Sequence, residues 1–267
     1  MLHSKFSYMV ISLLLTSFIS SCNKNYIISP NDITPQKQIS KVIQDDNNYS
    51  TFSYLNNRLS NYETINESKL FRSIILSYAG SNKLQSENFS DKYNSYLRKF
   101  NYDSTGRMVR ADYLYTDSSG NNPTINIYIN YLYNELGQLY KTEQYNYNSS
   151  SKVFDNTLNI NYKYDASGNV IERSMYTADG NLHEKETSTY DDKINPWYSL
   201  KDYFYYDVTL SKNNLSSETI TYPNTPSQNI HTDYTYTYDA NGYPFTCQIV
   251  AAQGENYSTI NEKFEYQ

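Results

Sequence analysis

Cys22 is the residue whose surroundings predict chemistry most clearly. It follows Ser20 and Ser21, an apolar run from Val10 to Ile19, and a polar start that carries Lys5. A short positive region, about ten apolar residues and small residues before a cut site are typical of a secretory signal peptide. The run is too short to span a bilayer, which takes about 20 apolar residues. We therefore expect residues 1–21 to be a signal peptide that export removes.

The junction Ile19-Ser20-Ser21-Cys22 resembles the bacterial lipobox, in which an aliphatic residue and two small residues precede a cysteine. The resemblance implies that the Cys22 sulfur receives a lipid, that the chain is cut before Cys22, and that the new amine is acylated. Several acyl chains anchor a protein stably. The alternative is a secreted protein whose cysteine happens to lie at the cut. Asn23 is not an aspartate, which favours the outer membrane over inner-membrane retention, with the protein facing the periplasm or the cell surface.

The other nucleophiles and metal ligands do not form a recognisable site. Cys247 is the only cysteine left after Cys22, so no intramolecular disulfide is expected, and its strand-like surroundings favour a small buried hydrophobe over a reactive thiol. His183 and His231 do not have metal-ligand spacing. No nucleophile elbow, phosphate loop or dinucleotide fingerprint is present. We expect no catalytic residues, no metal and no cofactor.

Acidic residues raise two functional interpretations, calcium binding and glycoside hydrolysis. Asp117, Asp165, Asp179 and Asp239 lie in turn-like segments that could suggest calcium, but none has the ligand spacing of an EF-hand loop, which favours plain turns. Two carboxylates brought together by the fold could hydrolyse a glycosidic bond. A hydrolase acting on envelope or dietary polysaccharide therefore stays an alternative, with a cleft around Trp197 as its most plausible place.

Composition indicates which kind of core must position these groups. The chain has 267 residues, among them 32 Tyr and 8 Gly, and a net charge of −6 that becomes about −7 once Lys5 is removed. An acidic chain without basic clusters is a poor nucleic-acid binder. Tyrosine favours strands, and its ring buries like a hydrophobe while its hydroxyl needs a partner. We expect a core built largely from tyrosine rings.

An internal repeat predicts the fold. Segments of the form Tyr-Asx-x-x-Gly start at Tyr102, Tyr133 and Tyr164, at intervals of 31 residues, and again at Tyr238, with a broken copy at Tyr190. An Asx residue followed three positions later by Gly is turn chemistry. Upstream, residues alternate with period two, which is typical of half-buried strands. One face carries Ile127, Ile129, Tyr131 and Tyr133 in one copy, Leu158, Ile160, Tyr162 and Tyr164 in the next, and Tyr234, Tyr236 and Tyr238 in the last.

The repeat indicates an all-β chain, an antiparallel meander of tyrosine-rich hairpins. Sheets of more than about ten strands tend to curl or close, and closure removes exposed edges. We expect a strongly curled sheet or a closed barrel over residues 66–267, with roughly a dozen strands. Leu70 to Tyr78 and Tyr93 to Tyr102 are expected to form its opening hairpin. Residues 22–65 are expected to be a lipidated tether, with a short helix around residues 36–44, and residues 191–230 an insertion or irregular hairpin.

The Tyr-Asp-x-x-Gly units resemble the YD repeats of RHS-type surface proteins. Together with the lipobox, the stretches Tyr190 to Pro196 and Ser211 to Asn214 are similar to lipoproteins of Bacteroides-like bacteria. The resemblance implies a porin-like, barrel-type antiparallel fold over about residues 66–267, and it brings no established activity and no catalytic residues. The chain has too few repeats to form the shell that large RHS proteins build around toxins.

These observations predict a cell-envelope lipoprotein, held at the membrane through Cys22, with a binding or structural role and no catalysis. Tyrosine-lined concave sheets can stack on sugars, so a glycan or a protein is the expected ligand, unless the tyrosines serve only as core. An outer-membrane barrel or pore is the alternative. It needs an apolar lipid-facing band, and the strand around Lys141 and Glu143 has no face of that kind.

Overall fold

Sixteen β-strands make up almost all of the ordered architecture. A computed structural model describes residues 37–80, 83–115, 124–201, 203 and 207–267. Cys22 and Asp117 lie outside this range, as do residues 22–36 of the expected tether. The first eight strands are β1 (Ile39–Ile43), β2 (Tyr49–Leu55), β3 (Arg58–Asn66), β4 (Lys69–Tyr78), β5 (Leu84–Asp91), β6 (Ser95–Tyr102), β7 (Met108–Tyr115) and β8 (Thr124–Tyr133). The others are β9 (Leu139–Asn148), β10 (Val153–Tyr164), β11 (Val170–Thr177), β12 (Leu182–Ile194), β13 (Asn213–Thr221), β14 (Ile230–Tyr238), β15 (Pro244–Gln253) and β16 (Asn256–Tyr266).

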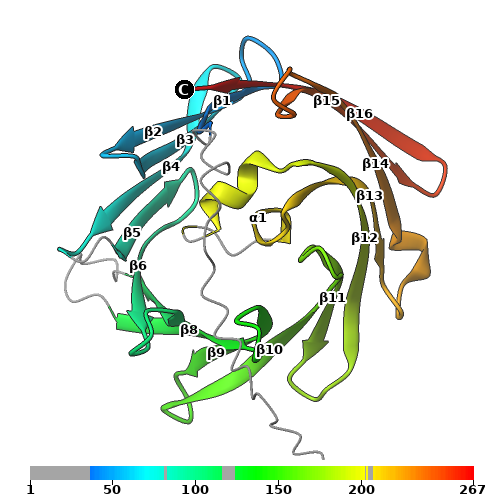
Figure 1. The fold of residues 1–267 in the computed structure, drawn as a ribbon. Helices are drawn as coiled ribbons and strands as arrows, with labels where there is room; N and C mark the ends of the chain where they lie inside the picture. Colours follow the sequence, from blue (N-terminus) through cyan, green and yellow to red (C-terminus); the bar gives the residue numbers. More distant parts are fainter. Residues whose placement is uncertain (1–36, 81–82, 116–123, 202, 204–206) are drawn as a thin grey trace, which may run out of the picture. The chain divides into compact units, whose positions relative to one another are not determined.

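The strands form a closed antiparallel barrel (Figure 1). Each strand pairs with its neighbours in sequence, as expected when short turns join antiparallel strands. The ring closes where β1 pairs with β16, with Val42 opposite Phe264 and Ile39 opposite Tyr266. Closure leaves no exposed strand edge in the sheet. The prediction of an all-β meander that closes into a barrel is confirmed.

The repeated turns have the chemistry that the sequence predicts. The side-chain oxygen of the leading Asx accepts hydrogen bonds from backbone N–H groups two or four residues further on; these Asx residues are Asp103, Asn134, Asp165 and Asp239. The glycine three residues after each Asx has a positive φ, for example +90° at Gly168, which is why glycine recurs there. The turn at Asp179 likewise uses its carboxylate to accept hydrogen bonds from Thr177 and Asn181.

Six tyrosines at or near the ends of even-numbered strands tie one hairpin to the previous one. The hydroxyl of each donates to a backbone carbonyl at or next to the start of the preceding strand, at 2.5–2.8 Å. The pairs are Tyr78 to Leu59, Tyr102 to Leu84, Tyr133 to Met108, Tyr164 to Leu139, Tyr190 to Val170 and Tyr266 to Pro244. We call this series the tyrosine ladder. It explains why the repeat keeps a tyrosine rather than a phenylalanine at this position.

Side chains alternate between the barrel interior and the outer wall. The faces expected to be buried in β8, β10 and β14 do point inward, and Tyr131 and Tyr162 belong to the hydrophobic core. On β14 the intervening His231, Asp233 and Thr235 are exposed. The interior also holds charge, since Glu87 is 1% and Arg98 8% exposed and the two form an ion pair. The core is thus aromatic and partly polar.

The segment between β12 and β13 folds into the barrel interior (Figure 1, yellow). It contains a 3-10 helix, η2 (Pro196–Leu200), and a short helix, α1 (Asp207–Leu210). The side chain of Asn195 holds its start, because Oδ1 accepts from the Trp197 backbone N–H and Nδ2 donates to the Ser211 carbonyl. Leu200 is 1% exposed within the core. No helix of the described residues is long and apolar enough to cross a membrane.

Three expectations about the N-terminal half are wrong. Residues 39–66, expected to be mostly tether, form β1, β2 and β3, and the expected helix around residues 36–44 is β1. Ile39, Phe52 and Leu59 are buried there and belong to the core. The expected opening hairpin is also wrong, because β5 lies between β4 and β6 and pairs with both. The irregular region at residues 191–230 consists of the end of β12, the interior segment, β13, a 3-10 turn, η3 (Pro226–Gln228), and the start of β14.

Candidate functional site

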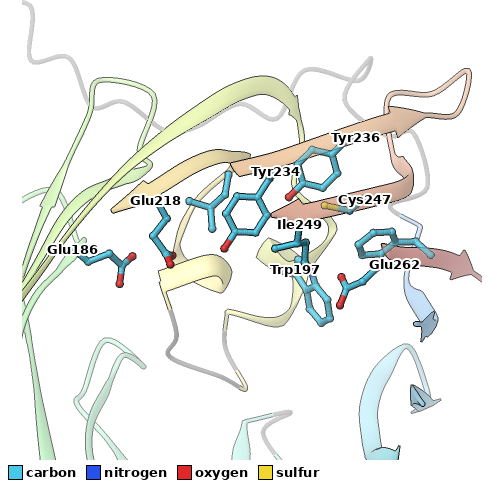
Figure 2. A pocket seen from close by; sticks show the side chains of 10 residues that line it. Glu186, Trp197, Glu218, Tyr234, Tyr236, Cys247, Ile249 and Glu262 are labelled. Atoms are coloured by element: carbon cyan, nitrogen blue, oxygen red, sulfur yellow. The ribbon is translucent and has the colours of Figure 1, made fainter. Parts of the chain in front are cut away.

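A cavity of about 370 Å³ lies inside the barrel wall formed by β12 to β16 (Figure 2). The interior segment covers it, because Trp197 of η2 lines it from within the barrel. A volume of a few hundred Å³ is that of a small-molecule site. Its lining residues are Glu186, Trp197, Leu215, Glu218, Tyr234, Tyr236, Cys247, Ile249, Glu262 and Phe264.

A second cavity of about 400 Å³ adjoins the first, and Trp197 and Glu262 line both. Its other walls come from β1 to β4 and are largely polar, with Gln44, Ser50 and Thr64 among them. Trp197 is held between the two cavities by edge-on ring contacts. Its ring centroid lies 5.7 Å from that of Phe52 on β2 and 6.3 Å from that of Phe264 on β16. We call the two cavities together the Trp197 pocket.

One end of the Trp197 pocket carries a charge cluster. The guanidinium of Arg173, on β11, lies 2.6 Å from the Glu184 carboxylate and 2.9 Å from that of Glu186, both on β12. Glu218 on β13 faces the same group. Burial and the neighbouring negative charge of Glu186 raise the pKa of Glu218 to about 7, although Arg173 opposes this shift. Glu218 therefore keeps its proton to a higher pH than an ordinary glutamate does.

The other end of the first cavity carries Glu262, on β16, where the two cavities meet. Its Oε1 accepts a hydrogen bond from Gln44 Nε2 at 3.3 Å. Burial raises the pKa of Glu262 above its ordinary value of 4.5. Among the described residues, no lysine or arginine lines either cavity. Between the two acidic ends, the wall is made of Tyr234, Tyr236 and Ile249 (Figure 2).

The structure does bring acids together beside Trp197, as the hydrolase alternative requires. Glu218 lies close enough to Glu186 for the two carboxyl groups to raise the pKa of Glu218 through their interaction. Glycosidases instead keep their two carboxyl groups about 5–9.5 Å apart, to leave room for the sugar or a water. The proximity of Glu186 and Glu218 fits a shared proton better than a pair of separate catalytic roles. Hydrolysis stays a prediction that the geometry does not favour.

The other residues singled out in the sequence have structural surroundings. Cys247 is 2% exposed and faces the Trp197 pocket, where burial raises the pKa of its thiol to about 12. His183 and His231 are exposed. In the described part of the chain, no three His, Cys, Asp or Glu side chains gather as a metal site would require. Asp165 and Asp239 act as turn caps.

The acids of the Trp197 pocket were not foreseen from the sequence, although one signal was available. Glu262 stands between Ile260 and Phe264 on a face with period-two alternation, where a charged residue is out of place. Glu186 and Glu218 carry a weaker signal, because their neighbours on the same faces include Ser188 and Ser216. Only the register of β12 with β13, which pairs Ser188 with Glu218, shows that the two acids meet.

The comparisons with known proteins concern the fold. No family model matches the sequence, and no curated protein matches it. The barrel is similar to a porin-like protein from Bacteroides uniformis, with 16% identity, 87% of this chain and 98% of that chain covered, and a TM-score of 0.53. It is also similar to a porin-like protein from Bacteroides vulgatus, with 11% identity, 86% and 99% coverage, and a TM-score of 0.52. At these identities the likeness shows a shared barrel architecture.

Proposed function

We propose that this chain is a cell-envelope lipoprotein, anchored through Cys22, whose barrel binds a ligand in the Trp197 pocket without catalysing a reaction. The observation that carries the proposal is the pocket itself. An aromatic side chain is held across the barrel interior between two cavities, and polar groups converge on it from several strands. Largely apolar walls with a few placed polar groups are the usual form of a small-molecule site.

A water-facing outer wall supports binding over membrane passage. Glu172 on β11 pairs outside the barrel with Lys163 and Lys185, each at 2.8 Å. On β7, Arg110 pairs with Asp112 at 2.6 Å. Charged side chains on the lipid face of a membrane barrel cost about 2–4 kcal/mol each near the bilayer centre. The interior segment also occupies space that a pore would leave open. These features favour ligand binding over a pore for this barrel.

The ligand classes expected from the sequence remain candidates for this pocket. The face of an indole or phenol ring can stack on a sugar, and carboxylates such as Glu262 accept hydrogen bonds from hydroxyl groups. A glycan is therefore a reasonable ligand. A protein partner would have to present a side chain or terminus into the pocket. A purely structural role would leave the pocket without any ligand.

Trp197 offers a direct test, because it is the only tryptophan in the sequence. The mature chain with Cys22→Ser, in detergent-free buffer, should change its tryptophan fluorescence and gain thermal stability with one class among glycans, amines and peptides. Trp197→Ala should weaken that stabilisation, whereas Tyr257→Ala, at an exposed site on β16, should not. A chain that ignores the whole panel would contradict the proposal. Aggregation relieved only by detergent would favour the membrane-barrel alternative.

The anchor needs a separate experiment. Cells that express the full chain should incorporate labelled palmitate into it, and Cys22→Ser should abolish the label. Cys247→Ser is the matched control, because Cys247 is buried in the barrel and should not affect labelling. Unlabelled wild-type chain that is still exported would show an ordinary secreted protein.

A further inference from the structure

We infer that the Trp197 pocket takes a linear organic cation, with protonated amines at its ends and an apolar middle. The inference rests on the proposed ligand site and specifies its chemistry. It follows from three features of the pocket: the sign of its charges, their placement at two ends, and the aromatic wall between them.

The charged side chains that line the Trp197 pocket are all acidic among the described residues. Three carboxyl groups line the first cavity, those of Glu186, Glu218 and Glu262, and no described lysine or arginine lines either cavity. The nearest cation, Arg173, is already shared between Glu184 and Glu186. Buried charges are normally paired. Arg173 and Glu186 face Glu218, and Gln44 donates to Glu262. A ligand that brings positive charge would add a cation beside each of these two acids.

The acids stand at opposite ends of the first cavity of the Trp197 pocket. Glu218 lies on β13 and Glu262 on β16, with β14 and β15 between them. Neighbouring strands are about 4.8 Å apart, so three strand spacings place β13 and β16 roughly 14 Å apart across the sheet. Figure 2 shows Glu186 and Glu218 on one side of Tyr234 and Ile249, with Glu262 on the other side near Trp197. A compact monovalent cation could not reach both ends, whereas an extended diamine or polyamine could.

The wall between the acids suits the hydrocarbon part of such a ligand. Tyr234, Tyr236 and Ile249 present apolar surface there, and methylene groups bury well against it. Trp197 adds a ring whose face attracts ammonium groups, the cation–π contact that is strongest for tryptophan. A metal ion is a poorer match, because no three acids in the described residues gather closely enough to coordinate one.

A matched ligand series tests the inference without any mutation. We expect α,ω-diamines of increasing length and spermidine to change Trp197 fluorescence with saturation, and diols of the same length to bind at least tenfold more weakly. Added salt should weaken amine binding and leave diol binding unchanged. If neutral oligosaccharides bind and amines do not, the inference falls while the proposed function stands. If amines, oligosaccharides and peptides all fail to bind, both fall.

Variants then locate the charges. Glu218→Gln and Glu262→Gln should each weaken spermidine binding about tenfold, and Glu255→Gln, in an exposed turn, should have no effect. Thermal unfolding checks that each variant is folded. Unchanged spermidine affinity in both folded pocket variants would overturn the inference.

Binding to the unaltered protein should also depend on pH. Glu218 is faced by Glu184, Glu186, Arg173 and Tyr234. Because its carboxyl must be ionised to hold an ammonium group, spermidine affinity should rise from pH 6 to pH 8 in the wild type. The rise should be smaller in Glu218→Gln, and an equal rise in both proteins would count against the inference.

Discussion

The hydroxyl of Tyr164 donates a hydrogen bond to the backbone carbonyl of Leu139 at 2.8 Å, across the join between two successive hairpins. The same contact recurs along the tyrosine ladder and gives the sequence repeat its physical meaning. At Tyr238 it is replaced, because that hydroxyl donates to the Asp191 carboxylate beside the interior segment. At Tyr54 the buried hydroxyl has no hydrogen-bond partner among the described residues. The ladder is thus interrupted near the interior segment and near the closure of the ring.

Removing one hydrogen bond of the tyrosine ladder should measurably destabilise the barrel. Tyr164→Phe leaves the ring in place but removes the donor, so the free energy of unfolding should fall by about 1 kcal/mol. Urea denaturation measures the change. Tyr140→Phe is the control, because Tyr140 is 41% exposed and should lie within about 0.5 kcal/mol of the wild type. Equal effects of the two substitutions would show that the ladder hydroxyl contributes nothing specific.

The repeated turn should not tolerate a side chain at its glycine. Gly168 has a φ of +90°, and a Cβ there would lie 3.2 Å from Lys212 Cε. Gly168→Ala should therefore lower the free energy of unfolding by about 1–2 kcal/mol. Gly80→Ala has open space around it and no such backbone constraint, and it should be nearly neutral. Chemical denaturation of both variants separates strain from a general effect of alanine.

The interior ion pair between Glu87 and Arg98 should matter far more than a surface pair. Glu87→Gln leaves a buried guanidinium without its charged partner and should cost about 3–5 kcal/mol of stability. Lys263 and Glu265 lie 3.4 Å apart with both side chains more than 40% exposed, so Glu265→Gln should cost less than about 1 kcal/mol. A small effect of Glu87→Gln would mean that water or a rearrangement satisfies Arg98.

Glu218 should make stability decrease as pH rises. Its folded pKa of about 7 lies above the ordinary 4.5, so the folded state holds this proton more tightly than the unfolded state. Its stabilising effect is complete below about pH 4.5 and is lost as pH rises to about 7. The difference in unfolding free energy between wild type and Glu218→Gln should change by about 1 kcal/mol over this range, after allowance for partial exposure. A constant difference would refute the raised pKa.

The corrected start of the barrel can be checked by truncation. A chain that begins at Lys37 keeps every strand and should unfold cooperatively in urea. A chain that begins at residue 66 lacks β1, β2 and nearly all of β3. It exposes the edges of β4 and β16 to other molecules, so it should aggregate. Cooperative unfolding of the shorter chain would restore the tether interpretation of residues 39–65.

The fold was predictable wherever the sequence signal is local. A turn is indicated within five residues by Tyr164, Asp165 and Gly168. The buried face of the strand before it is indicated by Ile160 and Tyr162. The first strands escaped prediction because the turns that join them lack the glycine of the repeat. Asn56 and Asn57 after β2, and Glu67 and Ser68 after β3, take the positive φ there instead.

The site was less predictable than the fold, because it depends on distant segments. Trp197 could be singled out as unique, but its neighbours Phe52 and Phe264 lie far from it in sequence. The inward direction of the segment after Ile194 depends on a barrel wide enough to admit it. That width depends on the number of strands, which the missed N-terminal strands raise to sixteen.

The pairing of β1 with β16 also constrains the order in which the barrel folds. A chain that emerges from a ribosome or a translocon does so N-terminus first. Each new hairpin can therefore pair with the preceding hairpin as soon as it appears. β1 must nevertheless keep one edge unsatisfied until β16 arrives. Ring closure is therefore the last event of maturation, and a growing open sheet precedes it. This interval is when a chaperone or a protease that recognises strand edges can act on the nascent protein.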